Sequence, residues 1–202
     1  MKILAWLHGR PMLAHVLERA AAIQGVDQVV LAVPERDVAL VAHLWPHVYG
    51  GSEKDVLGRY AHAAEKYEAD VIVRVTGDCP LLATDMADAA VSAFDELNGC
   101  YLGICQPYTP VADGWDVEVF SSWLLELANR KAGKHQREHV TTWMRENKKA
   151  VGLQWDNWTA LKCSVDTMED LQRVETIMNY LEDKSDFSHG ATWRAWEKAG
   201  RP

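Results

Sequence analysis

Val71-Ile-Val-Arg-Val-Thr-Gly-Asp-Cys-Pro-Leu-Leu82 decides the fold, because a run of strand-forming residues ends here in a glycine, an aspartate and a proline. The run predicts a buried strand that ends close to Asp78. In open α/β sheets, ligands bind just beyond the carboxyl ends of the strands. Asp78 is therefore a candidate ligand for a hard cation such as Mg²⁺, which prefers one or two carboxylates together with substrate phosphates.

Length and charge narrow the possible functions. The 202 residues suit one domain, residues 1–202, with a substantial core. The net charge of −8 argues against non-specific binding to nucleic acid or to an anionic membrane. A negatively charged substrate would then need a local basic site, completed by a metal.

The sequence gives no sign of a targeting segment or of a cysteine motif. No apolar run approaches the roughly 18 residues of a membrane span, and the run from Met1 to His8 is too short for a signal peptide. The four cysteines form no CxxC pair and have no metal-ligand spacing. They indicate reduced thiols in a cytoplasmic protein, with a disulfide framework as the alternative.

Helical and strand-like segments alternate along the chain. The expected helices are Pro11–Ile23, Glu35–His43, Asp55–Tyr67, Thr84–Leu97, a helix from Ser121 or Ser122 to Arg130, Gln136–Asn147, Thr167–Leu181 and Ala191–Lys198. The expected strands are Gln28–Val33, Val48–Tyr49, the strand from Val71, Tyr101–Cys105, Val117–Phe120, Val151–Trp155 and Leu161–Val165. This alternation predicts an α/β fold with a mostly parallel sheet and helices on both faces.

Caps and loops add detail to this pattern. Thr84 is an expected helix N-cap, and Thr167 with Asp170 has the spacing of a capping box. The loop Gln106–Gly114, rich in proline and glycine, is the expected flap over a site. Four late tryptophans indicate packing in the core or at an interface, which is compatible with a homodimer: Trp143, Trp155, Trp158 and Trp193.

A second strand-like segment also ends on an aspartate. Leu161-Lys-Cys-Ser-Val-Asp-Thr167 leads through Asp166 into a helix. Asp78 and Asp166 could share one Mg²⁺ at the same edge of the sheet. The alternative for Asp166 is a helix-start residue that only satisfies backbone N–H groups.

A glycine pair opens another helix at Gly50-Gly-Ser-Glu-Lys-Asp-Val-Leu-Gly-Arg-Tyr60. Free N–H groups at such a start can bind anions or base carbonyls. Arg59 follows Asp55 by four residues, so an ion pair along the helix is the structural alternative.

Two further segments carry polar groups that could meet a substrate. Asp116 and Glu118 are two residues apart in a predicted strand and therefore share a face, where they could contact hydroxyls or a cation; solvated edge charges are the alternative. In Arg137-Glu-His-Val-Thr141, His139 could act as a base or a substrate contact, or could be a structural histidine.

Taken together and in order, these segments resemble a known family. The motifs are Gly9-Arg-Pro-Met-Leu13, Gly-Ser-x-x-Asp-Val-Leu-x-Arg-Tyr, Gly-Asp-Cys-Pro-Leu-Leu, Asp-Val-Glu-Val-Phe, Arg-Glu-His-Val-Thr and Ser-Val-Asp-Thr-x-Glu-Asp-Leu. They closely resemble the cytidylyltransferases of the spore-coat polysaccharide type, which are related to the synthetases that activate acidic sugars as CMP derivatives. The resemblance covers roughly Lys2 to Tyr180.

The resemblance implies a Rossmann-like nucleotide-diphospho-sugar transferase fold and a reaction in which a sugar-acid hydroxyl attacks the α-phosphate of CTP. It implies that Asp78 and Asp166 hold Mg²⁺. The residues it places at the nucleotide are Lys2, Ser52, Asp55, Arg59, Thr76 and Gly77, and those it places toward the acceptor are Asp116, Glu118, Arg137 and His139. Phosphoryl-type transfer depends mainly on positioning and charge neutralisation, which suits these residues.

The chain departs from the family pattern at its start. The family opens with an apolar strand and a loop of the form Arg-x-Gly-Ser-x-Arg-Leu-Pro-Gly-Lys, whereas Lys2 stands where the final Lys of that loop would be. A missing central strand predicts unpaired edges and uncovered apolar surface. Met1 could be internal to a longer protein, the chain could be a non-catalytic binding or assembly subunit, or a partner chain could fill the gap. We expect the 202-residue form to be weak or inactive.

A glycosyltransferase that uses a nucleotide sugar and a metal is a third possible function. It would need an Asp-x-Asp metal motif, for which Asp116-Val-Glu118 is the nearest and a poor match. A smaller departure from the family is Gly58, which weakens a helix interior by roughly 1 kcal/mol relative to alanine.

Overall fold

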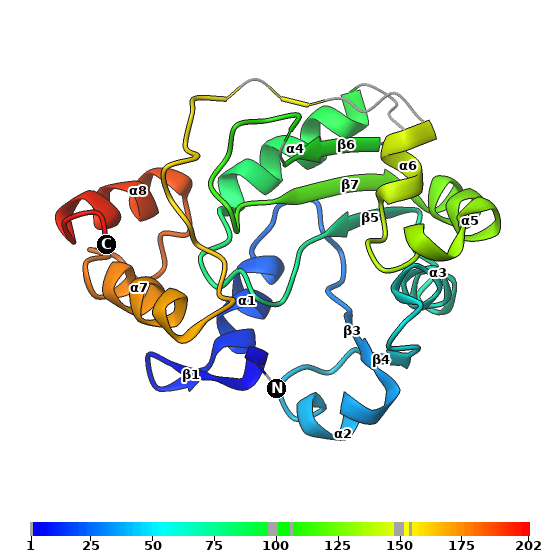
Figure 1. Ribbon diagram of the computed structural model, residues 1–202, viewed down its shortest axis with the longest axis horizontal. Coiled ribbons are helices and arrows are strands. Elements are labelled where there is room, and N and C mark those ends of the chain that lie inside the picture. Colours follow the sequence, from blue (N-terminus) through cyan, green and yellow to red (C-terminus); the bar gives the residue numbers. More distant parts are fainter. Residues whose placement is uncertain (1, 97–100, 106, 148–151, 154) are drawn as a thin grey trace.

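The computed structural model describes residues 2–96, 101–105, 107–147, 152–153 and 155–202 (Figure 1). The strands are β1 (Trp6–Leu7), β2 (Arg10–Pro11), β3 (Leu31–Pro34), β4 (Val48–Gly51), β5 (Val71–Arg74), β6 (Tyr101–Ile104) and β7 (Val117–Ser121). The α-helices are α1 (Met12–Ala21), α2 (Val38–Val41), α3 (Val56–Lys66), α4 (Thr84–Glu96), α5 (Ser122–Lys131), α6 (Thr142–Asn147), α7 (Met168–Asn179) and α8 (His189–Lys198). Three 3₁₀ turns complete the elements: η1 (Lys2–Leu4), η2 (Glu35–Asp37) and η3 (Lys134–Gln136).

The predicted α/β architecture is confirmed, with strand directions that are mixed. β3 and β4 pair in parallel, with Leu31 opposite Val48. β7 lies between β5 and β6 and runs antiparallel to both, so β5 and β6 share one direction. Figure 1 shows α7 and α8 at one end of the molecule and α3 and α5 at the other.

The sheet is divided between β3 and β5. Among the described strands, β3 pairs only with β4, and β5 pairs only with β7. An apolar cavity of about 170 Å³ lies between the two open edges, lined by Ala32 of β3 and Val73 of β5, Ile23 after α1, and Tyr60 and Ala63 from α3. The unpaired edges of β3 and β5 agree with the unpaired edges that the sequence predicted.

Several predicted helix boundaries agree with the structure because their caps are local. Ser121 Oγ accepts a hydrogen bond from the Leu124 N–H at the start of α5. Thr167 and Asp170 form the predicted capping box of α7. Thr84 is at the predicted start of α4, but as the first helical residue and not as the N-cap, and its N–H and hydroxyl both donate to the distant carbonyl of Phe187.

Other predicted elements are shorter or absent. The expected helix Glu35–His43 is reduced to η2 and α2, and the expected helix from Gln136 begins only at Thr142. Leu161–Val165 forms no strand and has a single bridge between Lys162 and Asp113. Leu97, Cys100, Gln106 and part of the expected strand 151–155 lie outside the described residues. The hairpin of β1 and β2 was not predicted.

The late tryptophans pack mainly inside the molecule. The rings of Trp155 and Trp158 lie 5.7 and 5.4 Å from that of His189, and Trp193 lies 4.5 Å from Trp158. His189 Nδ1 pairs with Asp85 of α4 at 2.5 Å, so this cluster docks α8 on α4. Core packing, one of the two predicted roles, therefore accounts for these three tryptophans. No helix among the described residues is both long enough and apolar enough to cross a bilayer.

Candidate active site

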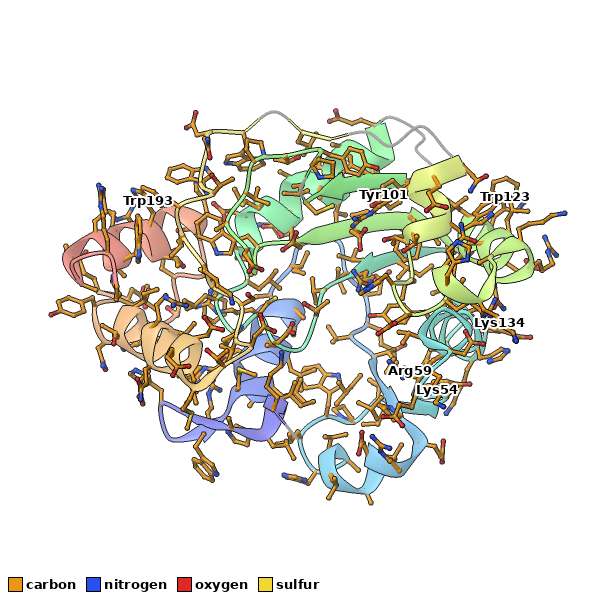
Figure 2. All side chains as sticks on the ribbon, in the orientation of Figure 1. Lys54, Arg59, Tyr101, Trp123, Lys134 and Trp193 are labelled. Atoms are coloured by element: carbon orange, nitrogen blue, oxygen red, sulfur yellow. The ribbon has the colours of Figure 1, made fainter. Side chains whose placement is uncertain are left out.

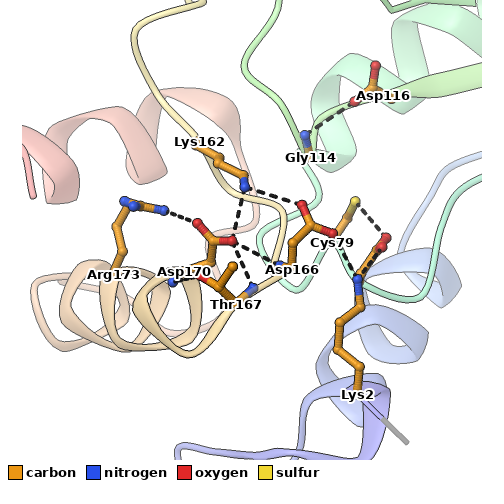
Figure 3. Close-up of polar contacts among 10 residues, drawn as sticks. Lys2, Cys79, Gly114, Asp116, Lys162, Asp166, Thr167, Asp170 and Arg173 are labelled. Carbon is orange, nitrogen blue, oxygen red and sulfur yellow. Dashed lines mark hydrogen bonds and ion pairs between the residues drawn. The ribbon is translucent and has the colours of Figure 1, made fainter.

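The structure brings Asp78 and Asp166 together around one lysine (Figure 3). Lys2 Nζ donates to Asp78 Oδ2 at 2.9 Å and to Asp166 Oδ1 at 3.0 Å. The segment carrying Asp166 is fixed to the end of β5 by a backbone hydrogen bond of 2.9 Å from Val165 N to the carbonyl of Asp78. Two carboxylates distant in sequence are thus within reach of a single cation, as the sequence predicted.

Lys2 and the two aspartates hold one another in their charged forms. Burial opposes the charge of Lys2, but hydrogen bonds to Asp78 and Asp166 outweigh it and raise the lysine pKa above its ordinary value. Burial also works against the Asp78 carboxylate, and the hydrogen bond from Lys2 nevertheless lowers its pKa. For Asp166, the hydrogen bonds from Lys2 and then Lys162 lower the pKa. The side chain of Asp166 is 56% exposed, so a substrate can reach this site.

A second lysine, Lys162, and a third aspartate, Asp170, form a polar cluster with Asp166. Lys162 Nζ bridges Asp166 Oδ2 at 3.2 Å and Asp170 Oδ2 at 3.0 Å. Asp170 also accepts from the N–H groups of Asp166 and Thr167, both at 3.0 Å, and from Arg173 at 2.5 Å. Lys162 was not among the predicted site residues, although it precedes Asp166 by four residues. Asp166 directly precedes Thr167, the N-cap of α7, but its carboxylate accepts from Lys2 and Lys162, so the alternative of a residue that only satisfies backbone N–H groups is wrong.

Asp116 approaches the same region from the loop before β7. Its Oδ2 accepts from the N–H of Gly114 at 3.2 Å, and burial raises the pKa of this carboxyl. Gly114 has a φ of +100°, and a Cβ there would lie 2.4 Å from Ser164 N. The loop therefore needs glycine at this position to pass so close to the segment that leads to Asp166.

Substitution of Gly114 should be costly. We expect Gly114→Ala to lower the free energy of unfolding by about 2–3 kcal/mol, because the new Cβ adds a clash to an unfavourable φ. Urea denaturation measures the change. Gly200→Ala is the matched control: its φ is +83° with no atom within 4 Å of a new Cβ, and it should cost only about 1 kcal/mol. Equal losses in the two variants would contradict the proposed close contact.

Asp55 and Arg137 form a second polar cluster at the start of α3. Arg137 Nε and Nη2 donate to the two oxygens of Asp55 at 2.8 and 2.9 Å. The hydrogen bonds from Arg137 lower the pKa of Asp55 despite partial burial. Asp55 also accepts from Gly58 N at 2.9 Å, and a Cβ on Gly58 would lie 2.5 Å from Asp55 Oδ2. This close approach explains why glycine stands inside the helix.

The structural alternative for Arg59, an ion pair with Asp55, is wrong. Arg59 Nη1 donates instead to the carbonyl of Ser52 at 2.7 Å, and Ser52 Oγ accepts from Asp55 N at 3.0 Å. Arg59 Nε is buried with no hydrogen-bond partner among the described residues. Arg59, labelled in Figure 2, also lines a cavity of about 240 Å³ with Thr76 and Gly77. The structure therefore brings these three predicted nucleotide contacts to one cavity.

Two of the predicted acceptor contacts lie elsewhere. Glu118 is 1% exposed in the central strand β7, where Tyr101, Thr141, Arg74 and Arg145 all donate to it. Both interpretations that the sequence offered for Glu118, a direct substrate contact and a solvated charge on an edge strand, are therefore wrong. Arg137 belongs to the Asp55 cluster, because its side chain is held there by Asp55 and by the Asn129 carbonyl at 2.9 Å.

His139 is exposed in the bend before α6, and its carbonyl accepts from Thr142 N at 3.0 Å. The helix predicted from Gln136 cannot include this segment, because Gln136 Oε1 accepts from Gly133 N and the Arg137 carbonyl accepts from Leu57 N.

In the parts of the chain that the structure describes, no three His, Cys, Asp or Glu side chains converge as a metal cluster. A cation at Asp78 and Asp166 would therefore rely on two protein carboxylates.

Comparisons with known proteins identify similar chains. The sequence profile of the cytidylyltransferase family matches residues 1–189. The spore coat polysaccharide biosynthesis protein SpsF of Bacillus subtilis is 26% identical over 190 residues, which cover 88% of this chain and 78% of that protein. The 3-deoxy-manno-octulosonate cytidylyltransferase of Geotalea uraniireducens is 31% identical over 109 residues, 50% of this chain and 42% of that enzyme.

A solved structure agrees over nearly the whole chain. A cytidylyltransferase from Leptospira borgpetersenii superposes with a TM-score of 0.90 at 27% identity, covering 98% of this chain and 88% of that one. The Rossmann-like nucleotidyltransferase fold that the sequence predicted is thereby confirmed.

Proposed function

Because this chain belongs to the cytidylyltransferase family, we propose that it transfers CMP from CTP to a hydroxyl of a sugar acid or a similar acceptor, with Mg²⁺ at Asp78 and Asp166. The observation that carries the proposal is the convergence of Asp78 and Asp166 on one ammonium, 2.9 and 3.0 Å away. The SpsF and 3-deoxy-manno-octulosonate relatives support a role in surface polysaccharide synthesis and an acidic sugar as acceptor.

The residues at this point fit a hard divalent cation. Two carboxylates on separate segments, open to solvent, leave the remaining positions to water and phosphate oxygens, which is the ligand set that Mg²⁺ prefers. When bound, the metal would neutralise charge on the nucleotide phosphates. The Lys2 ammonium, which is 38% exposed at its side chain, is then free to pair with a phosphate oxygen.

The nucleotide would lie along the cavity of Arg59, Thr76 and Gly77. The unpartnered buried Nε of Arg59 supports this placement, since a donor of this kind gains a hydrogen bond when a ligand enters. In the reaction, the acceptor oxygen forms a bond to the α-phosphorus while the bond to the pyrophosphate oxygen breaks. Asp116, with its raised pKa, is the carboxylate proposed to accept the proton that the attacking hydroxyl loses.

Pyrophosphate release from CTP, Mg²⁺ and a panel of sugar acids tests the proposal directly. We expect the 202-residue chain to be slow, because the cavity proposed for the nucleotide lies beside the unpaired edges of β3 and β5. A version extended at its N-terminus by an apolar strand and the loop Arg-x-Gly-Ser-x-Arg-Leu-Pro-Gly-Lys should be faster and more heat-stable, since the strand would fill the gap between β3 and β5. No release by either version would contradict the proposal.

A non-catalytic nucleotide-binding or assembly subunit is the second candidate, and the divided sheet is the observation that favours it. It predicts CTP binding without turnover in both versions and a self-associated particle in solution. A chain that is monomeric by analytical ultracentrifugation and turns over CTP would contradict it. The glycosyltransferase alternative would need Asp116-Val-Glu118 as a metal motif, and Glu118 cannot serve in it because this side chain is buried in an internal network.

A further inference from the structure

A buried arginine lies outside the candidate active site. Arg19 of α1 is 2% exposed. Its Nη1 donates to the carbonyl of Leu82 at 2.9 Å, and its guanidinium carbon lies 4.5 Å from the centre of the Phe187 ring. Among the described residues it forms no ion pair. Burial lowers its pKa to about 10. Buried arginines are normally paired with an anion, so this charge is incompletely compensated.

Arg19 faces a small cavity that gathers positive charge. The cavity holds about 240 Å³ and lies between the β1–β2 hairpin, α1 and the chain that follows α7. Arg10 and Lys184 also line it, and Glu18 is the one carboxylate in its lining. The lining thus contains three cations and one carboxylate and is locally positive, whereas the whole chain has a net charge of −8.

Neutral groups contact the cations around Arg19, and Arg10 is also paired with Glu18. Arg10 Nη2 donates to His15 Nδ1 at 3.1 Å, while the Nε2–H of His15 donates to the Leu7 carbonyl at 2.8 Å. Burial lowers the pKa of His15, which favours the neutral ring that this arrangement requires. Lys184 Nζ donates to the carbonyl of Met178, and an ammonium has three donors. Donors therefore remain available to a ligand in the cavity.

We propose that this cavity binds a phosphate group. Arginine presents planar pairs of donors that match phosphate oxygens, and lysine adds a mobile charge. A bound phosphate would supply the counter-charge that Arg19 lacks. The apolar part of the lining, formed by Met178, Leu181 and Phe187, would suit the carbon part of a phosphate monoester. The site is separate from the carboxylates at Asp78 and Asp166, neither of which lines this cavity.

Titration calorimetry of the 202-residue chain with inorganic phosphate and with phenyl phosphate tests the proposal. We expect saturable binding of one phosphate per chain at low ionic strength. Tighter binding of phenyl phosphate would indicate a monoester as the natural ligand, and equal or weaker binding would indicate free phosphate. Absence of saturable binding of both probes would overturn the proposal.

Variants of the residues that line the cavity test whether phosphate binds there or elsewhere on the chain. Arg10→Gln and Lys184→Gln should each weaken phosphate binding about tenfold, since each removes a charge-assisted contact. Arg36→Gln is the matched control for Arg10, because Arg36 is likewise an exposed arginine paired with a glutamate, Glu53. It should leave the affinity unchanged.

Glu18→Gln should increase the affinity for phosphate, and a variant that failed to fold could not show such an increase. Removing the one carboxylate of the lining should tighten phosphate binding several-fold, because it removes repulsion and frees Arg10 from its ion pair. An affinity that is unchanged in Glu18→Gln and Lys184→Gln but lost in Lys2→Gln would place the phosphate at the candidate active site and overturn the proposal.

Discussion

Replacing Glu118 by glutamine is expected to lower the free energy of unfolding by about 3–5 kcal/mol. The Glu118 carboxylate is 1% exposed and accepts from the Tyr101 hydroxyl at 2.6 Å, from Thr141 Oγ1 at 2.7 Å and from Arg145 Nη2 at 2.5 Å, with Arg74 on its other oxygen. A glutamine keeps the shape but removes the charge. Arg74 and Arg145 would then be held in the interior without a counter-ion.

The pH dependence of this effect follows from the direction of the pKa shift. Burial opposes the Glu118 carboxylate, but Arg74 and then Arg145 outweigh burial and lower its pKa below the ordinary 4.5. A lowered pKa means that the stabilisation is fully present above pH 4.5 and is lost as the pH falls through the folded-state value. The difference in stability between the native chain and Glu118→Gln should therefore shrink below pH 4.5.

Urea denaturation at pH 7 and at a series of lower pH values measures both effects. Glu126→Gln is the control, because Glu126 pairs with Arg130 on the exposed surface of α5 and should contribute less than about 1 kcal/mol. A loss in Glu118→Gln no larger than that of the control would show that the buried network does not depend on its charge.

The sequence could predict those features of the site that depend on local pattern. A run of apolar residues ending in Gly-Asp predicted that Asp78 would stand at a strand end, and β5 ends at Arg74, four residues earlier. Capping chemistry predicted the start of α7 directly after Asp166 and Thr167. The end of the strand before Asp78 and the start of the helix after Asp166 together predicted that these two side chains lie close together.

Features that depend on distant contacts could not be predicted in this way. Glu118 has the spacing of a half-exposed strand residue, and only the arrival of Arg74 and Arg145 from other elements shows that it is buried. The expected helix at Gln136 failed for the same reason, because Arg137 is held by Asp55, the N-cap of α3. The segment 161–165 is apolar like a strand, but it is covered by the loop at Asp113 and Gly114 instead of pairing in the sheet.

Asp78→Asn is expected to reduce the rate of pyrophosphate release from CTP by about 1,000-fold, provided that the proposed metal site is correct. Asparagine keeps the size of the side chain but removes a negative charge from the pair that would hold Mg²⁺. Folding should change little, because the Lys2–Asp78 ion pair is partly exposed, at 38% and 30% of the two side chains. The rate is best measured in the N-terminally extended version, with the thermal midpoint as a check on folding.

Three further measurements distinguish a metal ligand from a residue that only supports the fold. A higher Mg²⁺ concentration should restore part of the activity of Asp78→Asn, since the variant weakens binding and leaves Asp166 in place. Asp166→Asn should resemble it, and the double variant should be little worse than either single one, because the two carboxylates act as a unit. Asp183→Asn, an exposed aspartate that accepts from Ser185 N at 2.8 Å, should behave like the native chain. If Asp78→Asn kept its activity and its Mg²⁺ dependence, the reacting phosphates would have to lie elsewhere on the sheet.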